Sequence, residues 1–164
     1  MKYLLLAATA LFALGLTTAE AKTCKLPNDE FSIATINIPD SWEPEEINNG
    51  VAGTSADKAV YLAAVAVGNE KGMNAEIEDT FAMLKEHNVD LDQSSKKENK
   101  FKVNGLDFEE MLFQGKDEDG PAAVSITFVP IKDKVLVLTY WVSTEQESKH
   151  QDEVMKIIKS IKAL

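Results

Sequence analysis

Residues 122–130 read AAVSITFVP and residues 135–142 read VLVLTYWV, and this pair of apolar runs decides the fold class. Both runs are rich in β-branched and aromatic residues, a composition that favours β-strands. The four residues between them, Ile131-Lys132-Asp133-Lys134, are typical of a turn, so the pattern predicts a β-hairpin. Because the second run is apolar at nearly every position, we expect both faces of its sheet to be covered.

The chain begins with a segment typical of a secretory signal peptide. Met1-Lys2-Tyr3 precedes an apolar run over residues 4–16, and the sequence TTAEA follows at 17–21. This pattern predicts cleavage after Ala21 and a periplasmic or secreted protein without a stable membrane anchor. An uncleaved anchor is the alternative, but the apolar run is shorter than the about 20 residues that a membrane-spanning helix needs.

The remainder of the 164-residue chain has the length of a single domain. Residues 22–30 show no periodicity and predict an N-terminal tail, and residues 31–164 predict one α+β domain. Cys24, in the predicted tail, is the sole cysteine; we expect a free thiol, with pairing between two chains as the alternative. The net charge is −10 and every basic side chain is a lysine, so we expect an acidic protein that does not bind nucleic acid.

Before the central hairpin the pattern predicts three strands and a helix. The strands cover residues 31–38, 50–55 and 59–67, and the helix begins at Asn74 and carries an apolar stripe at Ile77, Phe81 and Leu84. Residues 89–100 are polar, and predict either an edge strand or a loose connection. Asn104-Gly105 predicts a two-residue turn that joins two further strands, because both turn positions require positive φ.

After the central hairpin the sequence predicts a closing helix. Thr144 and Glu147 have the spacing of a capping box, and Val154, Ile157 and Ile161 share one apolar face. The predicted order is β-β-β-α-β-β-β-β-α. This order predicts an α/β/α sandwich with a mostly antiparallel central sheet of about six or seven strands and helices packed on it.

Three of these segments resemble the PsbP-like superfamily. They are the opening strand followed by Pro39 and Trp42, the hairpin at Val103-Asn104-Gly105, and the closing helix over residues 157–161. The superfamily includes the photosystem II extrinsic protein, a Ran-binding nuclear import factor and bacterial exported proteins of the DcrB type. The resemblance implies an α/β/α sandwich and non-enzymatic binding of other proteins. It transfers no site residue to this sequence.

Catalytic and metal-binding patterns are absent from the sequence. The two histidines, His87 and His150, lie near the ends of the predicted helices, where we expect both to be solvated. They cannot assemble a structural zinc site, and no cofactor motif is present. The acidic run at residues 117–120 predicts a solvated turn, with a weak divalent-ion site as the alternative. We therefore expect no enzyme, unless folding brings Glu110 and one histidine into the same pocket.

Two sets of residues are candidates for binding. Strand alternation places Glu110 on the apolar face and Glu109 on the opposite face, although an edge strand or bulge would let both carboxylates reach water. Together with Trp42 and Tyr140, Glu110 is expected to line a ligand cleft between the sheet and a helix. The alternative is that the aromatic side chains only fill the hydrophobic core, as aromatic residues in strands more often do. The acidic loop that contains Glu43, Glu45 and Glu46 is the candidate partner surface.

Two functions therefore stand open. The first is an exported, non-enzymatic accessory protein that supports an envelope or secreted protein partner. The alternative is a module that binds a small ligand or a divalent metal in the cleft.

Overall fold

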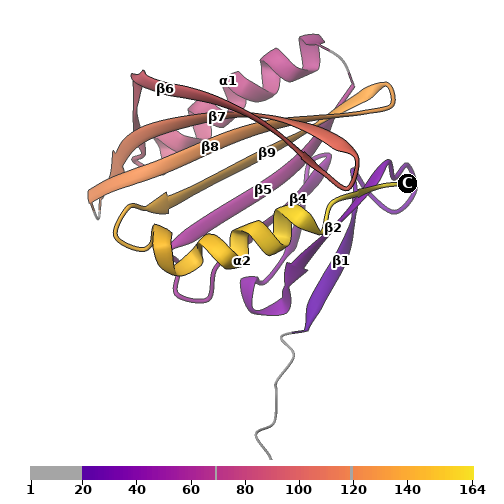
Figure 1. The fold of residues 1–164 in the computed structure, drawn as a ribbon, viewed down its shortest axis with the longest axis horizontal. Helices are drawn as coiled ribbons and strands as arrows, with labels where there is room; N and C mark the ends of the chain where they lie inside the picture. The colour runs from indigo at the N-terminus through magenta and orange to yellow at the C-terminus, as the bar shows by residue number, and fades with distance from the viewer. Residues whose placement is uncertain (1–19, 69, 119) are drawn as a thin grey trace, which may run out of the picture.

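The computed structural model describes residues 20–68, 70–118 and 120–164, and its main element is a seven-stranded antiparallel sheet with the order β3-β4-β5-β9-β8-β7-β6 (Figure 1). Its strands are β3 (Glu45–Ile47), β4 (Gly50–Thr54), β5 (Val60–Val67), β6 (Asp90–Val103), β7 (Leu106–Asp117), β8 (Gly120–Ile131) and β9 (Lys134–Ser143). The predicted signal peptide falls mostly on residues 1–19, outside the described residues.

The predicted central hairpin is confirmed. β8 and β9 pair in antiparallel register from Ala122 opposite Ser143 to Ile131 opposite Lys134. β9 lies between β5 and β8, and its residues 136–139 are all buried. The apolar run therefore has cover on both faces, because its strand is central and a core lies on each side of the sheet.

Two helices and a small second sheet cover the large sheet. On one face, α1 (Glu70–Glu86) contributes Leu84 to a core with Val65 and Val137. On the other face, α2 (Glu147–Lys159) contributes Ile157 to a core with Leu62 and Leu136. Alternate residues of β5 and β9 thus enter different cores, as the period of a strand requires. The predicted α+β sandwich is confirmed in this general form.

The prediction of an N-terminal tail over residues 22–30 is wrong for its first half. β1 (Ala21–Leu26) pairs with β2 (Ala34–Pro39), which in turn pairs with β10 (Lys162–Ala163), and these strands form a three-stranded sheet. Cys24 and Leu26 alternate onto the core side and are both buried. This two-residue apolar alternation is too short to be distinguished from chance in the sequence.

The element order differs from the predicted one by three short strands, β1, β3 and β10. Each is defined by pairing rather than by its own composition. For example, β3 overlaps the predicted acidic loop and pairs with β4 from Glu45 opposite Ala52. Of the two alternatives for residues 89–100, the edge strand is correct, because β6 pairs with β7 and has an irregularity between Asp92 and Lys97.

The helix starts also differ from their predictions. α1 begins at Glu70, so Asn74 lies inside the helix and is not its N-cap. α2 has Gln146 at its N-cap position with no side-chain hydrogen bond there, so the predicted capping box does not form. The predicted Asn-Gly turn is confirmed, with φ of 52° at Asn104 and 82° at Gly105.

Candidate functional site

Glu110 faces the core beneath α2, as the alternation of β7 predicts. Its exposed fraction is 9%, and the neighbouring Phe108 on the same face is fully buried. Glu109 is exposed on the opposite face, where its carboxylate accepts a hydrogen bond from the Lys100 Nζ at 2.7 Å. The two carboxylates therefore lie on opposite faces, with Glu110 largely buried and Glu109 exposed.

The Glu110 carboxylate belongs to a polar strip that crosses four strands, β6 to β9. The Ser125 Oγ donates to Glu110 Oε1 at 2.8 Å and lies 3.3 Å from the Thr127 Oγ1. The Asn99 Nδ2 is 3.4 Å from Glu110 Oε2, a long hydrogen bond. Tyr140 lies opposite Ser125 on β9. On the same sheet face lie apolar side chains such as Phe108 and Leu138.

A cavity of about 220 Å³ lies between this strip and the N-terminal half of α2. We call it the α2 cleft. The sheet contributes four lining residues and α2 contributes five: Glu110, Leu112, Tyr140 and Val142, then Glu147, His150, Gln151, Val154 and Met155. Glu110 and Tyr140, two of the three predicted ligand residues, therefore line one cleft between the sheet and a helix.

The Tyr140 side chain stays protonated at neutral pH. Burial, together with the negative charges of Glu110 and Glu147, raises its pKa to about 12. The phenol is consequently a hydrogen-bond donor as well as an acceptor at the wall of the cleft.

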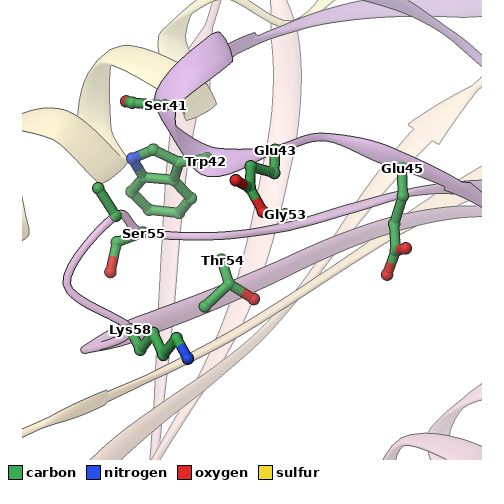
Figure 2. Close-up of a pocket in the computed structure, with 9 residues that line it drawn as sticks. Ser41, Trp42, Glu43, Glu45, Gly53, Thr54, Ser55 and Lys58 are labelled. Atoms are coloured by element: carbon green, nitrogen blue, oxygen red, sulfur yellow. The ribbon is translucent and has the colours of Figure 1, made fainter.

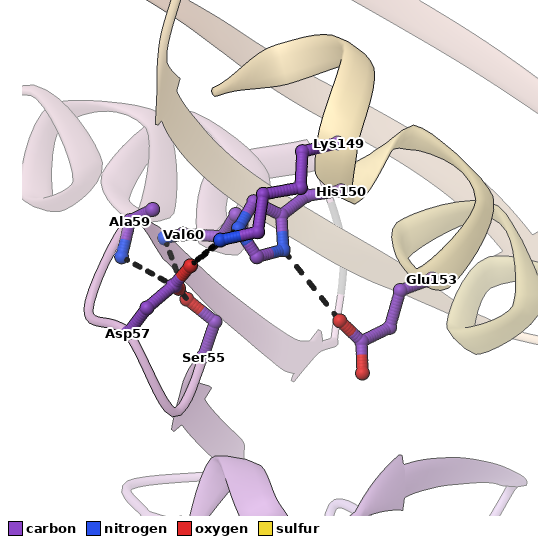
Figure 3. Close-up of polar contacts among 7 residues, drawn as sticks. All are labelled: Ser55, Asp57, Ala59, Val60, Lys149, His150 and Glu153. Carbon is purple, nitrogen blue, oxygen red and sulfur yellow. Dashed lines mark hydrogen bonds and ion pairs between the residues drawn. The ribbon is translucent and has the colours of Figure 1, made fainter. Parts of the chain in front are cut away.

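His150 is buried, not solvated as the sequence suggested. Its exposed fraction is 6%; its Nε2 lies 3.0 Å from the Asp57 Oδ2, and its Nδ1 lies 3.6 Å from the Glu153 Oε2 (Figure 3). A signal for this burial exists in the sequence, because His150 precedes Val154 by four residues and continues the apolar stripe of α2. Folding thus places Glu110 and a histidine on the lining of one pocket.

Asp57 ties the turn between β4 and β5 to α2. Its Oδ1 accepts hydrogen bonds from the Ser55 Oγ at 2.8 Å and from the Ala59 backbone N–H at 3.3 Å, and its Oδ2 pairs with the Lys149 Nζ (Figure 3). The Lys149 ammonium and the Ser55 hydroxyl hold the pKa of the Asp57 carboxyl well below its usual range. The sequence predicted the strands on either side of this turn, at residues 50–55 and 59–67, but not this connection.

Trp42, the third predicted ligand residue, does not reach the α2 cleft. It is 1% exposed and belongs to the core under α2, because η1 (Asp40–Trp42) turns its side chain inward. Its edge forms one wall of a separate groove of about 470 Å³ (Figure 2). The predicted ligand set of Trp42, Glu110 and Tyr140 is therefore divided between two cavities.

The groove beside Trp42 contains part of the predicted partner surface. It is lined by residues of η1, β3 and the loop between them, and of β4 with its following turn: Ser41, Trp42, Glu43, Glu45, Gly53, Thr54, Ser55, Ala56 and Lys58 (Figure 2). Glu43 and Glu45 lie in this lining, and Glu46 is exposed next to it on β3. The three carboxylates surround the edge strand of the large sheet.

The remaining candidate residues have local structural explanations. His87 is exposed and lies 5.4 Å from the Trp141 ring, which stacks on Tyr61 with a centroid distance of 4.4 Å. Burial raises the pKa of the Cys24 thiol. Within residues 20–68, 70–118 and 120–164, no group of three or more metal-ligating side chains comes together. Asp119, part of the acidic run considered for a divalent ion, lies outside the described residues.

None of the described helices is both long and apolar enough to span a membrane.

The architecture is the PsbP-like fold. The solution structure of cyanobacterial PsbP (CyanoP) from Synechocystis sp. superposes on it with a TM-score of 0.61 and 8% identity, covering 97% of this chain and 99% of that chain. A crystal structure from Bacteroides thetaiotaomicron superposes with a TM-score of 0.54 and 12% identity, over 80% of this chain and 45% of that one. No family model and no curated protein matches the sequence. At these identities the likeness establishes the fold alone.

Proposed function

We propose that the protein is an exported, non-enzymatic accessory protein that binds an extended, basic segment of a partner protein along β3. The observation that carries this proposal is the concentration of carboxylates around β3, the edge strand of the large sheet. The resemblance to PsbP-like proteins, which implied binding to other proteins, supports the same class of function.

β3 presents one row of backbone hydrogen-bonding groups to a partner. It pairs with β4 on one side and ends the sheet on the other. A sheet edge can accept an extended segment as an additional strand, and nearby side chains then select its sequence. At the opposite edge, β6 carries lysines and an irregularity, features that protect an edge from such pairing.

The carboxylates near β3 lie on both faces of the sheet. Glu45 is close enough to Tyr61, on the α1 face, to contribute to the raised pKa of that phenol, with burial as the larger cause. Glu46 contributes in the same way to the raised pKa of Cys24, on the β1 side. A strand added at this edge would therefore meet negative charge on both faces, which favours lysine or arginine in the partner.

The arrangement of the α2 cleft supports a non-enzymatic function. Although Glu110 and His150 both line it, the two ring nitrogens of His150 face the carboxylates of Asp57 and Glu153. The Ser125 hydroxyl donates to Glu110 and is completely buried. General base catalysis by His150 would need a ring nitrogen directed to a nucleophile.

The test is crosslinked capture of the tagged full chain, expressed and exported in its native cells, with identification of crosslinked peptides by mass spectrometry. We expect one stoichiometric partner whose basic segment crosslinks to residues 43–47. The triple variant E43Q/E45Q/E46Q should lose this partner, and binding should weaken with added salt because exposed charges are screened.

The control variant D133N/E145Q/D152N removes the same number of negative charges from exposed positions away from β3. It should retain the partner. Capture without a stoichiometric partner, or a partner that both triple variants retain equally, would overturn the proposal.

A further inference from the structure

We propose that the α2 cleft is a binding site for the ammonium group of a small aliphatic amine. The cleft lies on the α2 face of the sheet and is formed by β7, β9 and α2, whereas the groove beside Trp42 is formed by other residues. This proposal does not depend on the proposed binding of a partner protein at β3.

The charge of the cleft selects for a cation. Its lining contains the carboxylates of Glu110 and Glu147 and no lysine. Lys149, on the first turn of α2, pairs with Asp57 outside the lining, and the ring nitrogens of His150 face Asp57 and Glu153. An anionic ligand would meet two carboxylates without a compensating charge.

Glu110 lacks a cationic partner in the part of the chain that the structure describes. Its carboxylate accepts one short hydrogen bond, from Ser125, and one long one, from Asn99, although a carboxylate has capacity for about four. Burying a carboxylate is costly unless it is paired and hydrogen-bonded. An ammonium group has a positive charge and three N–H donors, so it would supply both the ion pair and the further hydrogen bonds.

The rest of the lining fits an aliphatic chain. Leu112, Val142, Val154 and Met155 provide apolar walls from both the sheet and the helix. The Tyr140 ring adds an aromatic surface that attracts cations. With about 220 Å³ available, the cleft is below the usual volume of drug-sized sites, so the ligand is a small amine.

The probe is n-butylammonium, titrated into the ¹⁵N-labelled protein at constant ionic strength and observed by NMR. n-Butanol and butyrate, which have the same chain with a neutral or a negative head, are titrated in parallel. We expect saturable shifts of the amide signals of residues 110, 140 and 150 with n-butylammonium alone. Equal shifts with n-butanol, or none with n-butylammonium at millimolar concentration, would overturn the proposal.

Variants locate the binding group. Glu110→Gln should weaken n-butylammonium binding about tenfold or more, because it removes a charge-assisted hydrogen bond. Glu109→Gln, one residue away on the opposite face, is the matched control and should bind like the unaltered protein. Met155→Trp should also abolish binding, because the larger side chain fills the cleft. This variant keeps Glu110 and therefore tests the site even if Glu110→Gln does not fold. Undiminished binding in every folded variant would overturn the assignment.

Discussion

Asn104 has two separate roles in the structure. Its backbone takes the positive φ of the turn between β6 and β7, and its side-chain Nδ2 donates to the backbone carbonyl oxygens of Lys159 at 2.9 Å and Ile161 at 2.8 Å. The Lys159 oxygen lies at the C-terminal end of α2, where carbonyl groups have no partner within the helix, and the Ile161 oxygen lies just beyond that end. One amide side chain therefore fixes the end of α2 to the tip of a hairpin.

Replacing Asn104 by aspartate separates the two roles. Aspartate tolerates the same backbone conformation, but its carboxylate cannot donate, and it places negative charge at the helix C-terminus. We expect Asn104→Asp to lower the free energy of unfolding by about 2 kcal/mol in urea titrations at pH 7. Asn49→Asp, at another position with positive φ, is the control and should lower the free energy of unfolding by less. Equal decreases for the two variants would contradict the role of the Asn104 side chain in holding the end of α2.

At the scale of elements, Asp57 connects the β4–β5 turn to α2. The carboxylate holds Lys149 and His150, on the first turns of the helix, while Ser55 and Ala59 fix it within its own turn. The N-terminal end of α2, which covers the α2 cleft, is thus held by Asp57, a residue that does not line the cleft. The position of α2 relative to Glu110 depends in part on this contact.

This contact makes stability depend on pH. Because the pKa of Asp57 is lowered in the folded protein, its contribution is present above its usual value of 3.8 and is lost as pH falls through the lowered value. We expect Asp57→Asn to lower the free energy of unfolding by about 1 kcal/mol at pH 7, a modest amount because the carboxylate is partly exposed.

The measurement is denaturant unfolding of both proteins at a series of pH values from 7 down to 2. The difference between the unaltered protein and Asp57→Asn should shrink below pH 4. Asp133→Asn, in the exposed turn between β8 and β9, should follow the unaltered protein throughout. A difference that stays constant with pH would show that Asp57 acts through something other than its charge.

At the scale of the whole molecule, β1 completes the core on the α2 side of the large sheet. Leu26 is fully buried and joins Ile36 and Ile161, from β2 and from the end of the chain, in one cluster. The first and last strands of the described chain therefore flank β2, which pairs with β1 on one side and β10 on the other (Figure 1).

A chain that begins at Phe31, the predicted start of the domain, should be markedly less stable than one that begins at Lys22. It loses the buried Leu26 side chain and leaves one side of β2 unpaired, which together cost at least about 2 kcal/mol. Thermal unfolding followed by circular dichroism measures the difference. Equal midpoints for the two chains would mean that residues 22–26 behave as the tail that the sequence suggested.

The sequence predicted the elements whose signals are local. The Asn-Gly turn and the central hairpin follow from residue type and a period of two, and the structure confirms them. For Glu110 the same alternation left two alternatives open, and in the structure its side chain is largely buried. The candidate site was predicted in part, since Glu110 and Tyr140 line one cleft but Trp42 lines another cavity. Strand alternation gives the face of a residue, not its neighbours on other elements.

The sequence alone therefore determined the fold class, the main strands and the acidic character of the chain, because these depend on patterns within short segments. Tertiary structure decided the pairing of β1, the burial of His150 and the composition of the α2 cleft. His150 meets Asp57, which is 93 residues away in the chain, and Glu110 on β7 accepts a hydrogen bond from Ser125 on the neighbouring β8. Such contacts follow from how the elements pack, and periodicity within one element carries no record of them.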